Sequence, residues 1–129
     1  MRSGDIFLEK FVITQDVYEA FKNTFKDFNA LHTDDAYARS KGFSEKVMHG
    51  NILNGFLSCF VGELLPFKNT IIHSSRITYK KPCYLNDEVN LEANLVDVYD
   101  SVGAYLFKFK FLVRGEVRAL GEIQVGLIN

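Results

Sequence analysis

An acidic and a basic side chain in the first third of the chain are of the types that carry out acid–base catalysis. Asp27 and His32 lie five positions apart in the segment Asp27-Phe28-Asn29-Ala30-Leu31-His32. Neighbours on one helix face are three or four residues apart, so this spacing favours a loop in which both side chains converge on one point. The pair predicts a small enzyme that transfers protons. A structural interpretation stays open, in which Asp27 caps a turn, His32 begins a helix and Asn29 closes an Asx-turn.

The dipeptide His49-Gly50 is the second candidate element, because it stands directly before a long apolar segment. Backbone N–H groups at a helix start are unpaired and carry partial positive charge. Glycine also lets another atom approach the backbone closely. Gly50 is therefore a candidate to stabilise a carbonyl oxygen that becomes an oxyanion. His49 is equally compatible with a packing role, and His73, alone in a predicted strand, is interpreted as structural.

Composition excludes several classes of protein. The chain has 129 residues, with 15 basic and 16 acidic side chains and a net charge of −1. This balance argues against a nucleic-acid binder, which would carry a basic surplus. The short basic clusters Lys80-Lys81 and Lys108/Lys110 are interpreted as solvated strand faces, although a basic rim for a phosphate-bearing ligand stays open.

The two cysteines indicate neither a metal centre nor a redox pair, because Cys59 and Cys83 lack the spacing of ligand pairs. No cofactor and no metal are expected, and Cys59 is expected to pack as a small hydrophobe. The N-terminus leads into no signal-peptide core, and no uncharged run reaches the roughly 18–20 residues that span a bilayer. We therefore expect a soluble, cytoplasmic protein without membrane contact.

Hydrophobic periodicity predicts the elements that must position these residues. In the first part of the chain it favours a strand over 6–13, a helix over 15–24, a loop over 26–33 and a short helix over 34–40. The clearest helix follows Gly50 and ends at Pro66, with Glu63 as its only charge. We expect this helix to be buried almost all round. Strands with a period of two follow over 70–81, 88–95, 105–113 and 117–127.

One apolar helix and an antiparallel sheet predict an α+β architecture in which the sheet wraps round the long central helix, the hot-dog fold. A single domain over residues 1–129 is expected at this length. An isolated sheet has exposed edges, so pairing with a second copy, as a homodimer or higher homo-oligomer, is expected as well.

These segments together resemble the MaoC-like, R-specific enoyl-CoA hydratase (hydratase 2) family. The family pattern is a D-x-N-P-x-H loop, an A/M-H-G segment that opens the central helix, and a strand that ends in a K-P-V…G-D turn. The corresponding segments here are residues 27–32, Val47-Met48-His49-Gly50 and Lys81-Pro82-Cys83-Tyr84-Leu85-Asn86-Asp87. Their order and intervals fit, and the resemblance covers the chain from about Gly4 to Leu127.

The resemblance implies reversible hydration of trans-2-enoyl thioesters to (R)-3-hydroxyacyl thioesters, a lyase activity on coenzyme A or acyl carrier protein substrates. It implies that Asp27 and His32 form the catalytic dyad and that the Gly50 N–H is the oxyanion donor. Supporting roles are implied for Asn29, His49 and Ser58.

Three positions depart from the family pattern. Ala30 replaces a proline, which leaves the loop before His32 less rigid, and Asn86 replaces a glycine, which asparagine tolerates at positive φ. Asn51 and Asn54 stand where the family is usually apolar. Their amides need partners, so both are expected to bind substrate by lining a polar acyl pocket.

Two alternatives remain. The first is a hot-dog acyl thioesterase, an enzyme that usually places an acidic residue on or beside the central helix. The only acid in that helix is Glu63, which lies near the end of the helix away from His49-Gly50. The second is a non-catalytic acyl-binding protein, for which Ala30 is the only support.

Overall fold

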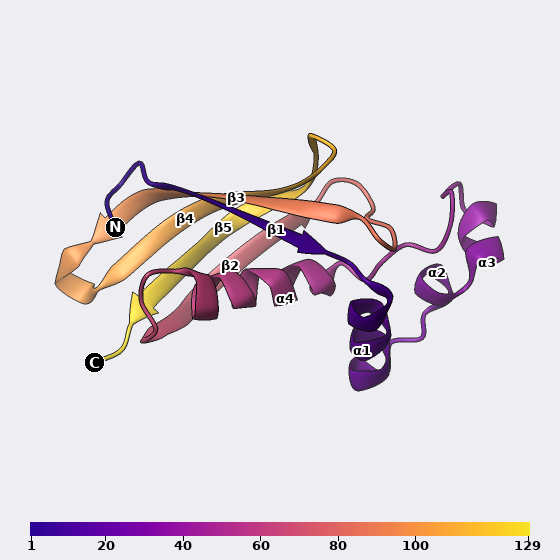
Figure 1. Cartoon of the computed structure of the whole chain (residues 1–129), viewed down its shortest axis with the longest axis horizontal. Coiled ribbons are helices and arrows are strands. Elements are labelled where there is room, and N and C mark those ends of the chain that lie inside the picture. The colour runs from indigo at the N-terminus through magenta and orange to yellow at the C-terminus, as the bar shows by residue number, and fades with distance from the viewer.

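A five-stranded antiparallel sheet forms one layer of the molecule (Figure 1), whose computed structural model describes residues 1–129. The strands lie in the order β1-β3-β4-β5-β2. Their bounds are Ile6–Val12 (β1), Thr70–Tyr79 (β2), Glu88–Tyr99 (β3), Ala104–Val113 (β4) and Glu116–Leu127 (β5). The sheet curves over one long helix, which confirms the predicted α+β hot-dog architecture.

The alternation of side chains along the two middle strands explains why this sheet has an apolar concave face. In β3, the residues Val89, Leu91, Ala93 and Leu95 are at most 1% exposed, and each is followed by a more exposed residue. In β4, three phenylalanines and Val113 are buried in the same way. Because successive side chains of a strand point to opposite faces, these residues form one layer of the core.

The central helix supplies the other layer of the core. It runs as α4 over Asn51–Cys59 and continues as one π-helical turn, η1, over Phe60–Leu64. The backbone becomes extended at Leu65, directly before Pro66. The expectation of burial all round is wrong, and so is the expected packing of Cys59, because the sheet covers only one side of α4. The open side carries Asn51, Gly55, Ser58, Cys59 and Gly62.

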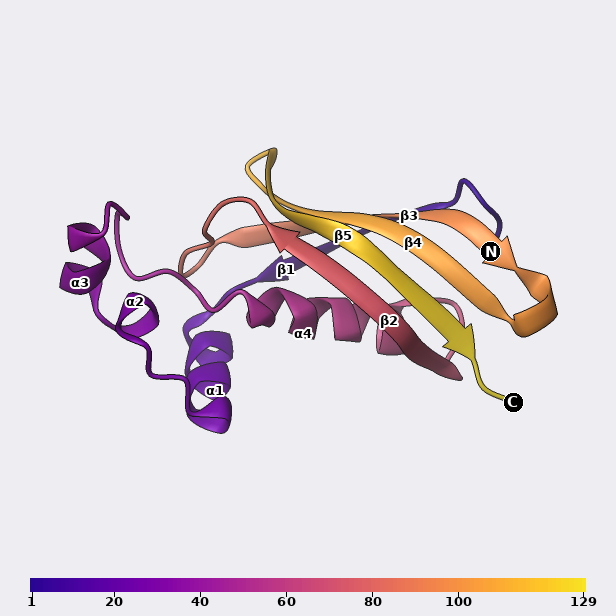
Figure 2. The ribbon, with the colours of Figure 1, turned by 180° about the vertical axis from the view of Figure 1, so that it is seen from behind.

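Three short helices cluster at one end of the sheet, at the start of α4 and away from both termini (Figures 1 and 2). They are α1 over Gln15–Phe25, α2 over Ala30–Thr33 and α3 over Asp35–Ser40. Thr14 caps α1 by accepting a hydrogen bond from the Val17 N–H. The segment 26–33, predicted to be a loop, thus contains a helical turn, because Asn29 supplies a cap that begins α2.

Three further features of the backbone bear on the expectations from sequence. Asn86 has φ of 70°, which confirms that an asparagine takes the conformation usually left to glycine. The free edges of β1 and β2 have no partner strand within the chain. None of the helices has both the length and the apolar character that crossing a bilayer requires.

Candidate active site

Three hydrogen bonds hold His32 in place: one caps the turn that carries it, one involves its ring and one its backbone carbonyl. Asn29 accepts a hydrogen bond from the Leu31 N–H at 2.9 Å, which starts the turn of α2 that carries His32. The His32 Nδ1–H donates to the Val47 carbonyl at 2.8 Å. The Tyr18 hydroxyl donates to the His32 carbonyl at 2.6 Å. In the neutral ring this arrangement leaves the lone pair on Nε2, so that atom is the proton acceptor.

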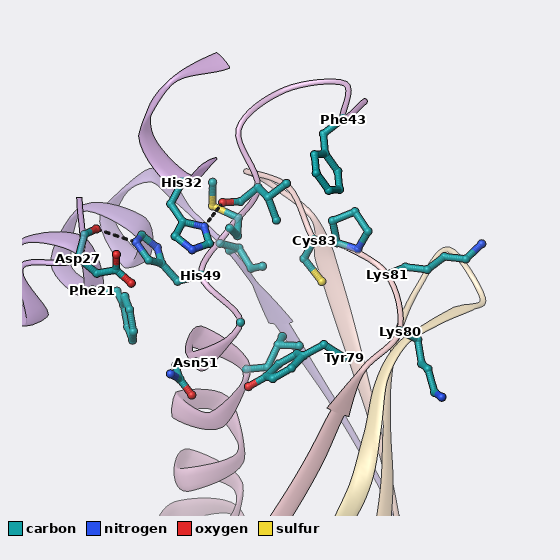
Figure 3. A pocket seen from close by; sticks show the side chains of 16 residues that line it. Phe21, Asp27, His32, Phe43, His49, Asn51, Tyr79, Lys80, Lys81 and Cys83 are labelled. Carbon is teal, nitrogen blue, oxygen red and sulfur yellow. Dashed lines mark hydrogen bonds between the residues drawn. The ribbon is translucent and has the colours of Figure 1, made fainter. Parts of the chain in front are cut away.

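Asp27 lies between α1 and α2, and its carboxylate shares one small region with both nearby histidines (Figure 3). One polar side-chain atom of each residue, a carboxylate oxygen of Asp27 and a ring nitrogen of His32 and of His49, lies within 4.8 Å of the other two. The Asp27 carboxylate also accepts a long hydrogen bond, 3.3 Å, from the Asn29 N–H. The structure therefore brings the predicted pair together, and Asn29 has the predicted turn-closing role at the same time.

His49 is buried directly behind Asp27 and His32, in contact with both residues. Its ring is 3% exposed and its centroid lies 4.2 Å from that of His32. Its Nε2–H donates to the Asp27 carbonyl at 3.0 Å, whereas Nδ1 is buried without a hydrogen-bond partner. Burial lowers the pKa of His49 below its ordinary value of 6.5, and the neighbouring His32 lowers it further, against the Asp27 contact, which raises it. The ring is therefore kept neutral and fixes the backbone of Asp27.

The low pKa of His49 predicts a loss of stability in mild acid. The unfolded chain takes up a proton near pH 6.5 while the folded chain resists it, so stability falls as the pH drops below 6.5 toward the folded pKa. Urea unfolding at pH 7.5 and pH 5.5 measures this difference. The matched variant His49→Gln should show a smaller difference between the two pH values, and an unchanged difference would contradict the role of His49.

Gly50 begins α4 in close contact with an aromatic ring. Its N–H makes no hydrogen bond to the rest of the chain and is free for a ligand. A Cβ at this position would lie 2.8 Å from Cε1 of Tyr79, so the ring of Tyr79 rests directly on the glycine. Tyr79 was not predicted as a site residue. Its only signal in the sequence is its position at the end of β2, next to Lys80 and Lys81.

A cavity of about 490 Å³ opens beside these groups (Figure 3). Gly50 is one of its lining residues, and Figure 3 shows Asp27 and His32 on one side of it with Lys80 and Lys81 on the opposite side. Lys81 pairs with Glu116 at 2.9 Å, whereas Lys80 makes no salt bridge. The cavity thus combines an acid–base pair, a free N–H at a helix start and a cationic rim.

The remaining predicted residues lie along α4. Asn51 lines the cavity, and Asn54 donates to the Asn51 side chain at 2.9 Å and to the Tyr79 hydroxyl at 3.1 Å. These bonds supply partners for the two amides. Ser58 lies further along the exposed side of α4 and lines neither this cavity nor a neighbouring one, so its supporting role stays a prediction.

Asp27, His32 and His49 are the one group of side chains with the ligand atoms and spacing for a metal ion.

Comparison with known proteins decides the family. The model of a family described as MaoC like domain matches residues 7–105. The chain belongs to the MaoC-like domain family. It is 32% identical over 109 residues to an (R)-specific enoyl-CoA hydratase of Aeromonas caviae, an alignment that covers 84% of this chain and 81% of that protein. The predicted family resemblance is confirmed.

This MaoC-like chain is also similar to a second curated relative and to a solved structure. It is 23% identical over 109 residues to a mitochondrial 3-hydroxyacyl-[acyl-carrier-protein] dehydratase of Arabidopsis thaliana, covering 84% of this chain and 64% of that protein. Among solved structures, an (R)-hydratase from A. caviae involved in PHA biosynthesis superposes with a TM-score of 0.90 at 25% identity. That superposition covers 99% of this chain and 98% of the other.

Proposed function

We propose that this MaoC-like domain catalyses the reversible hydration of trans-2-enoyl thioesters to (R)-3-hydroxyacyl thioesters, with residues 1–129 acting as one unit. The observation that carries the proposal is the convergence of Asp27 and His32 beside the free N–H of Gly50. Relatives named as an enoyl-CoA hydratase and a hydroxyacyl dehydratase, which run this reaction in its two directions, support it.

The dyad would hold one water molecule between the Asp27 carboxylate and Nε2 of His32. One member accepts a proton as the hydroxyl adds at C3, and a proton is delivered to C2, so the elements of water are added across the double bond. The His32 tautomer fixed by Val47 keeps Nε2 available as an acceptor. His49 would hold the backbone of Asp27 in place through its Nε2–H.

The thioester oxygen gains negative charge as the hydroxyl adds, because electrons move from the double bond toward the carbonyl group. The Gly50 N–H stands at the positive end of α4 and would donate to that oxygen. Tyr79 presses on Gly50 and limits how far the start of α4 can move.

A single assay tests the proposal against its alternatives. The protein is incubated with crotonyl-CoA, and loss of the conjugated enoyl absorbance and release of free thiol are followed in the same sample. Hydration without thiol release is the expected result, with (R)-3-hydroxybutyryl-CoA identified by chiral analysis. Thiol release would indicate a thioesterase, and neither change would indicate an acyl-binding protein.

Both candidate carriers, coenzyme A and acyl carrier protein, present a thioester on a phosphopantetheine arm. Lys80, unpaired at the rim of the cavity, is placed to meet a carrier phosphate. Lys80→Gln should therefore raise KM for crotonyl-CoA by about two- to fivefold, the size of an exposed charge contact.

The same substitution should leave KM for crotonyl-N-acetylcysteamine, which lacks the phosphates, nearly unchanged. Lys108→Gln is the matched control, since Lys108 is exposed on β4 away from this cavity. An equal rise with both substrates, or the same rise in the control, would contradict a phosphate contact.

A homodimer or higher homo-oligomer is part of the proposed assembly. Two features support it: the unpaired edge of β2, which exposes Ile71 and Ile72, and the uncharged open side of α4. Light scattering coupled to gel filtration measures the mass directly, and a monomer at micromolar concentration would remove this part of the proposal.

A further inference from the structure

Both histidines that line the cavity beside Gly50 are held in the way that proteins hold metal ligands. The His32 Nδ1–H donates to the Val47 carbonyl at 2.8 Å. The His49 Nε2–H donates to the Asp27 carbonyl at 3.0 Å. A histidine that binds a metal almost always donates its other ring N–H to a carbonyl, a carboxylate or water, which fixes the tautomer. Each ring thus has one nitrogen tied to the backbone and one nitrogen with a free lone pair.

The second nitrogen of His49 is a buried atom without a partner. Nδ1 makes no hydrogen bond, although the residue is only 3% exposed. Buried polar atoms without a partner are rare in folded proteins, and a bound ion is one explanation for them. The function proposed above uses the lone pair of His32 and leaves that of His49 without a role.

The Asp27 carboxylate completes a set of three ligands (Figure 3). One of its oxygens and one ring nitrogen of each histidine all lie within 4.8 Å of one another. Tetrahedral zinc, with bonds of about 2.0–2.1 Å, holds its ligand atoms about 3.3 Å apart, so these atoms must close by up to roughly 1.5 Å. The Asp27 side chain is able to make this movement, because it is exposed and its hydrogen bond from the Asn29 N–H is 3.3 Å long.

We propose that Asp27, His32 and His49 bind a divalent transition metal of the zinc type, and that the bound ion inhibits hydration. Two imidazoles and one carboxylate suit zinc, whereas magnesium prefers oxygen ligands. The cavity leaves a fourth position open for water. The ion takes the His32 lone pair and the carboxylate that the dyad needs for proton transfer. The inhibition rests on the proposed function, but the binding site does not.

Binding is tested on the wild-type protein without substrate, by competition for Zn²⁺ with a chromophoric chelator. We expect one equivalent of Zn²⁺ per chain, which Mg²⁺ at the same concentration does not displace. The absence of binding, which the sequence-based expectation of no metal predicts, would overturn the inference and leave the hydratase function intact. Displacement by Mg²⁺ would overturn the assignment to a metal of the zinc type.

Ligand variants locate the ion. Asp27→Asn and His49→Gln each replace a strong ligand with a neutral amide, so each should weaken Zn²⁺ binding by at least about tenfold. His73→Ala and Cys59→Ser are the matched controls, because both residues are exposed and lie outside the group. Unchanged affinity in either ligand variant, shown by circular dichroism to be folded, would overturn the site. An equal loss of affinity in either control would overturn it as well.

The effect on catalysis is measured with crotonyl-N-acetylcysteamine, which lacks the phosphates through which coenzyme A would itself bind Zn²⁺. Zn²⁺ at about ten times its dissociation constant should lower the hydration rate about tenfold, by simple occupancy. EDTA should restore the rate, and Mg²⁺ should leave it unchanged. Bound Zn²⁺ with an unchanged or faster rate would overturn the inhibitory role. A metal-free protein that hydrates no enoyl thioester would remove the proposed function, while the chelator competition would still decide the site.

Discussion

Asp27→Asn and His32→Ala are each expected to lower kcat for enoyl-thioester hydration by at least about 100-fold. The amide of Asn acts neither as a general base nor as a general acid at neutral pH, and Ala removes the Nε2 lone pair that the Val47 contact leaves free. Initial rates with crotonyl-CoA measure the loss. Neither side chain belongs to the buried core, so thermal unfolding should show that both variants stay folded.

Matched substitutions elsewhere separate catalysis from general damage. His73 is exposed on β2 and bonds only to Gln124, and Asp97 is exposed on β3. His73→Ala and Asp97→Asn should therefore keep wild-type turnover. Wild-type-like turnover in either dyad variant would remove that residue from the mechanism.

Gly50→Ala is expected to lower kcat/KM by about 10- to 100-fold. The new methyl group would lie 2.8 Å from the Tyr79 ring, closer than two non-bonded carbon atoms approach each other, so either the ring or the start of α4 must move. A displaced N–H loses alignment with the thioester oxygen, and small displacements of catalytic groups have effects of this size. Steady-state kinetics with crotonyl-CoA measure the change.

The same helix offers a control for Gly50→Ala. A methyl group added at Gly62 would meet no other atom within 4 Å, so Gly62→Ala should not lower activity. Adding Tyr79→Leu to Gly50→Ala removes the ring that the methyl group meets and should restore part of the lost activity. No loss in Gly50→Ala, or no recovery in the double variant, would contradict the proposed contact.

The strands were predictable because alternation along β3 and β4 directly records which face of the sheet is buried. Val89, Leu91 and Phe107 lie inward as their period of two requires. The central helix was placed correctly, but its burial was overestimated. Lack of charge on a helix face does not distinguish a covered face from an open one that is small and uncharged, as at Gly55 and Ser58.

The site was predictable only where its residues are close in sequence. The segment from Asp27 to His32 and the dipeptide His49-Gly50 carried enough pattern to be recognised. The contact of Tyr79 with Gly50 joins positions 29 residues apart, and no local periodicity reports it. A second cavity, between α1 and α4, has the same origin, since its walls come from two helices separated by α2 and α3.

The absence of a proline at Ala30 is balanced by the predicted turn at Asn29 and by two tertiary contacts that the sequence did not indicate. Asn29 caps the turn, Tyr18 donates to the His32 carbonyl and Val47 accepts from its ring. Tyr18 is buried, so its hydroxyl is a fixed anchor. His32 is thus held by tertiary hydrogen bonds in place of a rigid backbone.

The four-residue helix α2 has a consequence for how the site forms. A single turn with one capping residue lies far below the length at which a helix persists in water, so α2 exists only while it is docked on Tyr18 and Val47. The sheet, joined by long ladders of strand pairing, has no such dependence. We therefore expect the segment that carries His32 to form a separate, weaker cooperative unit, which opens and recloses while the rest of the chain stays folded.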